Sequence, residues 1–321
     1  MKCAIVVGAA ILALCSGSLN AQQGYPNKVV RMVVPTTAGS GPDIVARILA
    51  AKLAEALGQQ VVVDNRAGAG GTVGAGIAAR AAPDGYTLLI AGGALTINPI
   101  MYRKLPYDAV NDFAPISQIV SLPFILVVHP SLPATTVPQL IALAKSRPNQ
   151  LNYASAGIGG GPHMAMELFL GMTHTTMTHV PYKGASSGVI DMLAGQVTVM
   201  MPNVLTVVPY VKGGRLRALG VTGANRTVAL PEIPPIAEAG VPGYEAVQWY
   251  GVFAPASTPK EIISRLNSEI VRIVKLAEVK DRLAGDGADP VGGSPGELAA
   301  FLKSEISKWA KVARDSGLKP E

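Results

Sequence analysis

The sequence predicts an α/β fold made of two successive α/β units, and three observations support this. Short apolar runs rich in Val and Ile alternate with amphipathic segments of helical spacing. A strand, a glycine-dense loop and a helix follow one another twice, with Gly41-Pro42 and Gly161-Pro162 at the two helix entries. The 321 residues, 49% of them hydrophobic and 15% charged, supply enough core for two domains. The alternation favours a largely parallel sheet in each domain.

The N-terminus has the features of a secretory signal. An apolar run at residues 4–14 precedes small residues that end at Ala21. Residues 1–21 are therefore expected to be a signal peptide that is cleaved after Ala21. The apolar run is too short to span a bilayer, although a retained anchor is the alternative.

Both cysteines lie in this leader, at Cys3 and Cys15. The mature chain is therefore expected to contain neither a disulfide nor a catalytic thiol. Lipid attachment at Cys15 is the less favoured alternative, because Leu14 is bulkier than the small residue that usually precedes a lipid-bearing cysteine.

The first unit opens on an apolar strand at residues 30–34. Gly39, Gly41 and Pro42 break that pattern, and apolar residues then recur at helical spacing as far as Leu57. Further strands are expected at residues 61–63 and 86–90, with an Ala-rich helix between them and a loop-rich region at residues 92–115.

The rest of the chain continues the alternation. Strands are expected at residues 116–120, 124–128, 151–155, 177–180, 197–200, 217–221 and 246–254, and helices at residues 137–146, 187–194 and 204–211 and after Gly161. The strand at 246–254 would return the chain to the first domain. Two C-terminal helices are expected to begin at capping boxes, one formed by Thr258 with Glu261 and one by Ser294 with Glu297.

The two glycine loops are the clearest functional signal in the residues themselves. A glycine-rich turn at a helix start leaves backbone N–H groups uncovered next to the positive end of the helix dipole. Two such loops in different domains would suit a ligand with two anionic ends. Neither loop contains Arg or Lys, so recognition would rest on backbone groups. Lys183, Arg66 and Asn203 are the expected nearby polar side chains, with a turn role as the alternative for Asn203. An ordinary βα turn is the alternative for each loop taken alone.

Motifs for catalysis, metal binding and nucleic-acid binding are incomplete. Ser186 and Ser294 each lie in a Gly-x-Ser-x-Gly pattern, but every histidine precedes Ser186, whereas a hydrolase elbow needs a later base. His174 and His179 have no neighbouring carboxylate or cysteine to complete a metal site. Basic residues form no stripe interleaved with aromatic ones. We therefore predict no enzyme activity, cofactor, metal or nucleic-acid partner.

A set of ordered motifs carries a family resemblance. These motifs are Tyr25-Pro-x-Lys, Arg31-x-Val-Val-Pro, Asp43-Ile-Val-Ala-Arg, Asn65-Arg-x-Gly-Ala-Gly-Gly, Ala82-Pro-Asp-Gly-Tyr-Thr-Leu, Ile97-Asn-Pro, Leu105-Pro-Tyr-Asp, Asp112-Phe-Ala-Pro, Leu151-Asn-Tyr-Ala-Ser-Ala-Gly, His179-Val-Pro-Tyr-Lys-Gly and Gly240-Val-Pro-Gly-Tyr. Together they resemble the Bug family, the periplasmic solute-binding receptors of tripartite tricarboxylate transporters. The resemblance covers essentially the whole mature chain. It implies a two-domain periplasmic binding protein fold of type II, with two hinge crossovers and a ligand cleft between the domains.

Combined with the strand pattern, the resemblance assigns residues 22–122 and 246–321 to domain 1 and residues 123–245 to domain 2. It implies a monomeric periplasmic receptor that captures a small carboxylate by hinge closure at about residues 120–124 and 244–247. The receptor would deliver this ligand to the integral-membrane permease of the transporter. A sensor component without transport and an enzyme acting on a carboxylate are the alternatives.

In that family, the loops matching residues 36–43 and 155–163 hold the ligand's carboxylates, largely through main-chain groups and waters. The expected ligand-binding residues are Thr36, Thr37, Ala38, Gly39, Ser40, Gly41, Asp43, Ser155, Ala156, Gly157, Gly159, Gly160, His163, Lys183 and Asn203. The sequence departs from the family's usual residues at Thr36, Ser40, Pro42, Leu95, Gly160 and Pro202. Ligand preference is expected to depend chiefly on the first three of these.

Overall fold

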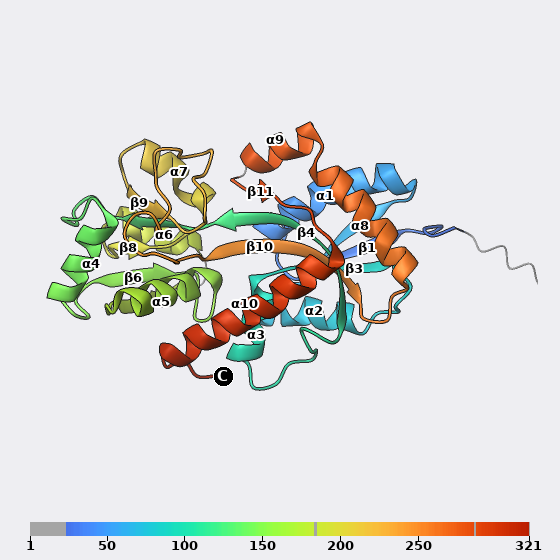
Figure 1. The fold of residues 1–321 in the computed structure, drawn as a ribbon, viewed down its shortest axis with the longest axis horizontal. Coiled ribbons are helices and arrows are strands. Elements are labelled where there is room, and N and C mark those ends of the chain that lie inside the picture. The colour runs from blue at the N-terminus through green and yellow to red at the C-terminus, as the bar shows by residue number, and fades with distance from the viewer. Residues whose placement is uncertain (1–23, 183–184, 286, 321) are drawn as a thin grey trace, which may run out of the picture.

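The computed structural model describes residues 24–182, 185–285 and 287–320, so the predicted leader and Lys183 lie outside the described residues. The chain forms two lobes, each built around one β-sheet, that lie side by side along the longest axis (Figure 1). The predicted α/β class is therefore confirmed. Within the described ranges, no helix combines the length and the apolar character needed to cross a membrane.

The first lobe contains a six-stranded sheet in the order β11-β4-β10-β3-β1-β2. Its strands are β1 (Val30–Val34), β2 (Val61–Asn65), β3 (Thr87–Gly92), β4 (Phe113–Pro123), β10 (Val247–Pro255) and β11 (Asp289–Pro290). Its helices are α1 (Gly41–Leu57), the 3-10 turn η1 (Ala69–Gly71), α2 (Thr72–Ala79), α3 (Gly93–Met101), α8 (Lys260–Val274) and α9 (Ala277–Gly285). Helices cover both faces, which explains why the strands are apolar runs rather than alternating patterns.

The second lobe contains a five-stranded sheet in the order β7-β6-β8-β5-β9. Its strands are β5 (Ile125–Val128), β6 (Asn152–Ser155), β7 (Thr178–Pro181), β8 (Val199–Met200) and β9 (Arg217–Val221). Its helices are α4 (Val137–Ser146), α5 (Gly161–Thr173), α6 (Ala185–Leu193) and α7 (Val204–Lys212). Their bounds lie close to the predicted ones, because strongly periodic apolar segments determine element type locally.

Both sheets are mixed, so the prediction of largely parallel sheets is only partly right. In the first lobe β1 pairs in parallel with β2 and β3, whereas β10 is antiparallel to β3 and β4. In the second lobe β6 is parallel to β7 and β8, whereas β5 is antiparallel to β8 and β9. The antiparallel strands are those next to the two chain crossings between the lobes, where the chain leaves one sheet and later returns to it.

These two crossings lie next to each other. The chain passes from β4 into β5 after Pro123, and it returns from the second lobe into β10 at Val247. Val247 is the register partner of Pro123, and β4 and β10 run together through the centre of the molecule (Figure 1). The lobes are therefore connected by two adjacent segments, as the predicted fold with two crossovers requires.

The last helix, α10 (Pro295–Asp315), extends over both lobes (Figure 1). Its start has the predicted capping box, in which Ser294 Oγ accepts the N–H of Glu297 and Glu297 accepts the N–H of Ser294. Leu298 and Leu302 lie in the core of the first lobe. Further along the helix, Trp309, Val312 and Ala313 lie in the core of the second lobe. This single helix thus contributes to both cores.

One local prediction is incomplete and another is wrong. The region predicted to be rich in loops, residues 92–115, also contains α3, which buries Leu95, Ile97 and Met101. Pro99 lies inside this helix and removes one helical hydrogen bond, a loss that the burial of apolar side chains offsets. The predicted capping box at Thr258 is absent, since α8 begins at Lys260 and Thr258 Oγ1 instead donates to the carbonyl of Pro255 at 2.7 Å.

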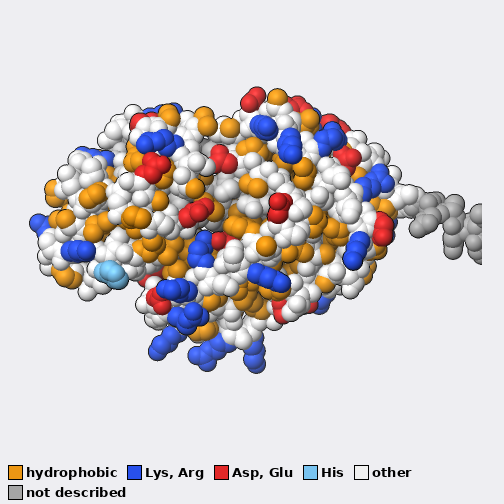
Figure 2. All heavy atoms as spheres, in the orientation of Figure 1, with side chains coloured by type: hydrophobic (Ala, Val, Ile, Leu, Met, Phe, Trp, Pro, Cys, Tyr) orange, Lys and Arg blue, Asp and Glu red, His pale blue; other side chains and the backbone are white. Residues whose placement is uncertain are grey.

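Charged side chains are distributed unevenly over the surface. Figure 2 shows acidic and basic side chains interspersed over both lobes, with Lys and Arg gathered at the lower edge of this face. The full chain carries a net charge of +6. Most charges therefore form a mixed, solvated surface, as is usual for globular proteins.

Candidate functional site

The two glycine loops adopt the same backbone geometry, one in each lobe. The residue before each helix is extended, with φ −77° and ψ 163° at Ser40 and φ −70° and ψ 158° at Gly160. The residue before that is a glycine with positive φ, +78° at Gly39 and +71° at Gly159, a region that other residues rarely adopt. The structure therefore places two matching turns at the N-termini of α1 and α5.

The hydrogen bonds inside the loops also match. The N–H of Ser40 donates to the carbonyl of Thr37, and that of Gly160 donates to the carbonyl of Gly157, both at 3.3 Å. The N–H of Gly39 donates to Asp43 Oδ2 at 2.8 Å, and that of Gly159 donates to His163 Nδ1 at 3.0 Å. Each loop is thus held by a side chain four residues further on, a carboxylate in one lobe and an imidazole in the other.

These internal bonds determine which N–H groups remain for a ligand. Among the hydrogen bonds of the described residues, none uses the N–H of Ala38, Gly41, Ile158 or Gly161. All four belong to the loops or to the first residue of the following helix, where the helix dipole favours an anion. Sequence reasoning missed Ile158 and Gly161, although the alignment of the two loops pairs them with Ala38 and Gly41.

Asp43 is buried at 2% exposure, and both of its oxygens accept hydrogen bonds from the protein. Oδ2 accepts from Gly39 and from Arg47 Nε at 2.9 Å, and Oδ1 accepts from Asn65 Nδ2 at 3.0 Å. The hydrogen bond from Arg47 lowers the pKa of Asp43 against the opposing effect of burial. The carboxylate is therefore an anion that holds the first loop in place.

Thr36 and Ser40, two of the positions that depart from the family pattern, bond to each other. Ser40 Oγ donates its proton to the carbonyl of Thr37 at 2.7 Å. A hydroxyl has only one proton, so in the 2.6 Å contact between Thr36 Oγ1 and Ser40 Oγ the threonine is the donor. The two hydroxyls thus add a side-chain link across the first loop.

Next to the second loop, the rings of His163, His179 and Tyr153 form a stack. His163 is 2% exposed and lies 4.0 Å from the ring of His179, which in turn lies 4.8 Å from the ring of Tyr153. His179 Nε2 is 2.6 Å from Ser155 Oγ, and Ser155 Oγ accepts the N–H of Gly157 at 3.1 Å. Ser155 and His163 are both buried, and each holds the second loop by accepting one of its backbone N–H groups.

Burial, together with a smaller effect of the neighbouring His179, lowers the pKa of His163 to about 3. The ring is neutral at ordinary pH, and because Nδ1 accepts the N–H of Gly159, the network assigns the proton to Nε2. Nε2 lies 3.7 Å from Glu167, which also accepts the hydroxyl of Tyr153. A neutral acceptor at position 163 is thus required for this loop geometry.

We expect wild-type stability to depend on this neutral histidine below pH 6.5. An unfolded chain binds a proton at His163 that the folded chain excludes, so the free energy of unfolding should fall by up to about 1.4 kcal/mol per pH unit between about pH 6.5 and pH 3. His163→Asn keeps an acceptor for the N–H of Gly159. It should remove this part of the pH dependence of the free energy of unfolding, which is measured by urea unfolding at a series of pH values. His174→Asn, at an exposed position, should keep it. Identical slopes in wild type and His163→Asn would contradict the prediction.

Two of the predicted ligand-binding residues, Lys183 and Asn203, lie outside the two glycine loops. Lys183 lies outside the described residues. Asn203 precedes α7 and bridges to Phe124 at the crossing between the lobes. Its buried Oδ1 has no hydrogen-bond partner among the described residues. Asn203 thus lies near the crossing, and its orphaned oxygen leaves a polar group that a ligand or water would satisfy.

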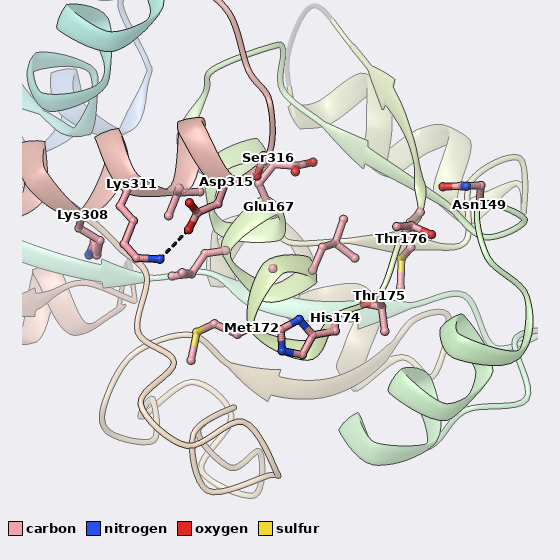
Figure 3. Close-up of a pocket in the computed structure, with 15 residues that line it drawn as sticks. Asn149, Glu167, Met172, His174, Thr175, Thr176, Lys308, Lys311, Asp315 and Ser316 are labelled. Atoms are coloured by element: carbon pink, nitrogen blue, oxygen red, sulfur yellow. Dashed lines mark hydrogen bonds and ion pairs between the residues drawn. The ribbon is translucent and has the colours of Figure 1, made fainter.

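A cavity of about 810 Å³ lies away from both glycine loops. It is lined by the second half of α5, the turn after it and the end of α10, and it includes Glu167, His174, Lys308 and Asp315 (Figure 3). On one side of this cavity, Lys311 Nζ pairs with Asp315 at 2.5 Å. No residue of either glycine loop lines the cavity, so it is separate from the site predicted here. Within the described ranges, no group of three or more His, Cys, Asp and Glu side chains is placed to hold a metal.

Comparisons with known proteins identify the family and the fold of the chain. A family model described as the tripartite tricarboxylate transporter family receptor, TctC, matches residues 45–318. A solved structure of R. palustris Rpa4515 with adipate is 38% identical, with a TM-score of 0.82 over 92% of this chain and 100% of that one. The periplasmic binding protein BugD is 31% identical, with a TM-score of 0.78 over 92% of this chain and 100% of its own.

A further solved structure, MatC from Rhodopseudomonas palustris with bound malate, is 31% identical, with a TM-score of 0.75 over 90% of this chain and 99% of that one. The family model covers most of the chain, and the solved structures are two-domain periplasmic binding proteins. The resemblance predicted from the sequence motifs and the predicted two-domain fold are thus confirmed. The chain therefore belongs to the tripartite tricarboxylate transporter receptor family.

Proposed function

We propose that this chain is a periplasmic receptor that captures a small carboxylate between its two lobes and delivers it to a tripartite tricarboxylate-type permease. The observation that carries this proposal is the pair of matching loops, one in each lobe, with unused N–H groups at Ala38, Gly41, Ile158 and Gly161. The bound adipate and malate of the related structures support a carboxylate as the ligand class. Members of this family are solute-binding receptors, which supports a binding role without catalysis.

The proposed binding energy comes from several small terms. Each helix end contributes about 0.3–1 kcal/mol, and up to about 2 kcal/mol when partly buried. Each charge-assisted hydrogen bond contributes about 1.5–3 kcal/mol. Four such bonds and two helix ends approach the roughly −8 kcal/mol of a micromolar complex once the costs of ordering are subtracted. No arginine or lysine in the loops is needed for this affinity.

In this proposal the lobes close as rigid bodies about the two adjacent crossings, at about residues 120–124 and 244–247. Residues 22–122 and 246–321 would form one moving body, and residues 123–245 the other. The second loop already contacts the first lobe, because a Cβ placed on Gly159 would lie 2.8 Å from Met101 Cγ at the end of α3. The second loop therefore lies at the boundary between the lobes, where closure would take place.

The proposal is tested with the purified chain from residue 22 onward, without its predicted leader, and a panel of mono-, di- and tricarboxylates with their uncharged amides as controls. A ligand at a hundred times its dissociation constant should stabilise the protein by about 2.7 kcal/mol, which appears as a higher unfolding midpoint. At least one carboxylate should bind and its amide should not. If amides bind as well as acids, or if no carboxylate binds, the anion-site proposal is wrong. Uptake of the bound acid is then measured in a strain that lacks this protein. Loss of uptake indicates transport, and unchanged uptake indicates sensing.

A further inference from the structure

Strand β10 brings two polar side chains to the place where the lobes meet. Gln248 and Tyr250 are two residues apart on this strand, so their side chains point to the same face of the sheet. Trp249, between them, points the other way and packs with Phe253 in the core of the first lobe. Gln248 is half-buried, and Tyr250 is 4% exposed. The pair therefore lies below the surface, next to the crossings.

Each side chain of the pair lies against the first residue of one of the two helices that follow the glycine loops, α1 and α5. A Cβ placed on Gly41, the first residue of α1, would lie 2.9 Å from Tyr250 Oη. A Cβ placed on Gly161, the first residue of α5, would lie 3.0 Å from Gln248 Oε1. Gly41 and Gly161 are equivalent positions of the two matching loops. The pair thus connects the two candidate anion sites.

Further glycines make room for the same two side chains. A Cβ on Gly92 would lie 2.7 Å from Tyr250 Cδ1, and one on Gly93, the first residue of α3, would lie 3.2 Å from Gln248 Oε1. Glycine at these positions lets the backbone approach the pair closely. Gln248 and Tyr250 are therefore surrounded by the starts of α1, α3 and α5.

The phenol of Tyr250 and the amide carbonyl of Gln248 can each form a further hydrogen bond. Burial raises the pKa of Tyr250, and the neighbouring Gln248 side chain partly opposes that change. The phenol is therefore protonated, and among the described residues no group accepts its proton. A glutamine amide carbonyl accepts two hydrogen bonds, so the pair offers one donor and one acceptor between the two loops.

A purely structural role would not require these residue types. Apolar side chains of similar volume would fill the space below the glycines equally well, and they would leave no phenol proton without an acceptor. Polar atoms in such a place are best explained by a ligand that completes their hydrogen bonds. The ligand's carboxylates would occupy the loops, so the pair faces the part of the ligand between its ends.

We propose that Gln248 and Tyr250 contact the middle of the bound carboxylate and select ligands that carry a hydroxyl group on the carbon chain. This inference rests on the proposed function of the same site. A hydroxyl donates to the amide carbonyl of Gln248 and accepts from the phenol of Tyr250. An unsubstituted methylene at that point leaves both protein groups unpaired, which is how sites reject analogues that lack a hydrogen-bonding group.

The test measures dissociation constants by calorimetry for pairs of acids that differ only in one hydroxyl: succinate and malate, glutarate and 2-hydroxyglutarate, adipate and 2-hydroxyadipate. For the chain length that binds best, wild type should prefer the hydroxy acid by about tenfold or more. Tyr250→Phe and Gln248→Met should each reduce this preference to about threefold or less, with the affinity for the unsubstituted acid changed by no more than about threefold. Tyr210→Phe, on α7 in the second lobe, is the matched control.

Equal affinity of wild type for both members of every pair would overturn the inference, and so would an unchanged preference in both variants. A loss of affinity that is the same for both acids would assign the pair to carboxylate binding or to structure, which also overturns it. If wild type binds none of these acids or any other carboxylate, the proposed function itself fails. Thermal unfolding of each variant shows whether it is folded, and two independent variants keep the test decisive.

Discussion

Replacing Gly161 with valine is expected to weaken carboxylate binding by roughly 100-fold or more. A Cβ at this position would lie 2.9 Å from Phe124 Cζ and 3.0 Å from Gln248 Oε1, so the start of α5 must move away from the crossing. The N–H groups of Ile158 and Gly161 would then be misplaced, and two lost charge-assisted hydrogen bonds of about 1.5 kcal/mol each correspond to that change in affinity. Calorimetry with the best ligand of the carboxylate panel measures it.

The matched control is Gly171→Val on the same helix. A Cβ on Gly171 would meet no atom within 4 Å, so the change from glycine to valine occurs without a clash and far from the loop. Its affinity should stay within about threefold of wild type, as is usual for surface substitutions away from special features. Equal losses in the two variants would show that α5 acts through its overall stability and not through its N-terminus.

Trp309→Ala should lower the free energy of unfolding by about 3–5 kcal/mol. The indole is 2% exposed in the core of the second lobe, and its Nε1 donates to Glu305 Oε2 at 2.8 Å. The substitution leaves a cavity and also removes one of the two partners of the buried Glu305 carboxylate, the other being Lys308. Urea unfolding followed by circular dichroism measures the loss.

Lys303→Ala, at an exposed position of the same helix, should change the free energy of unfolding by no more than about 0.5 kcal/mol. A loss below about 1 kcal/mol in Trp309→Ala would mean that the end of α10 is not part of the second core. In that case the helix would only rest on the lobe, and the packing described here would not determine stability.

Much of the fold is predictable because the relevant signals are local. The apolar run at Val30–Val34, the glycine break and the helix as far as Leu57 are neighbours in the sequence, and their periodicity alone indicates strand, turn and helix. The duplicated Gly-Pro pairs at Gly41 and Gly161 likewise identify matching loops. Sequence reasoning thus located both halves of the candidate site before any tertiary information.

The parts that could not be predicted depend on contacts between distant segments. Gln248 and Tyr250 lie on a strand whose apolar pattern indicates only burial, and their relation to Gly161 and Gly41 follows from the return of the chain through the second crossing. Helix α3 contains Pro99, so local propensity argues against it, and only the burial of its apolar face explains it. In both cases tertiary packing overrides the local signal.

The path of α10 has a consequence for how the protein acquires its structure. The core of the second lobe is built largely from residues 124–246, yet Trp309, Val312 and Ala313 complete it from near the end of the chain. The central segment therefore cannot finish burying its apolar surface until almost the whole polypeptide is present. Folding of one lobe ahead of the other is disfavoured, and the loop closures that join residues so distant in sequence slow the final step. A shortened chain that lacks the last helix should leave that apolar surface open to aggregation.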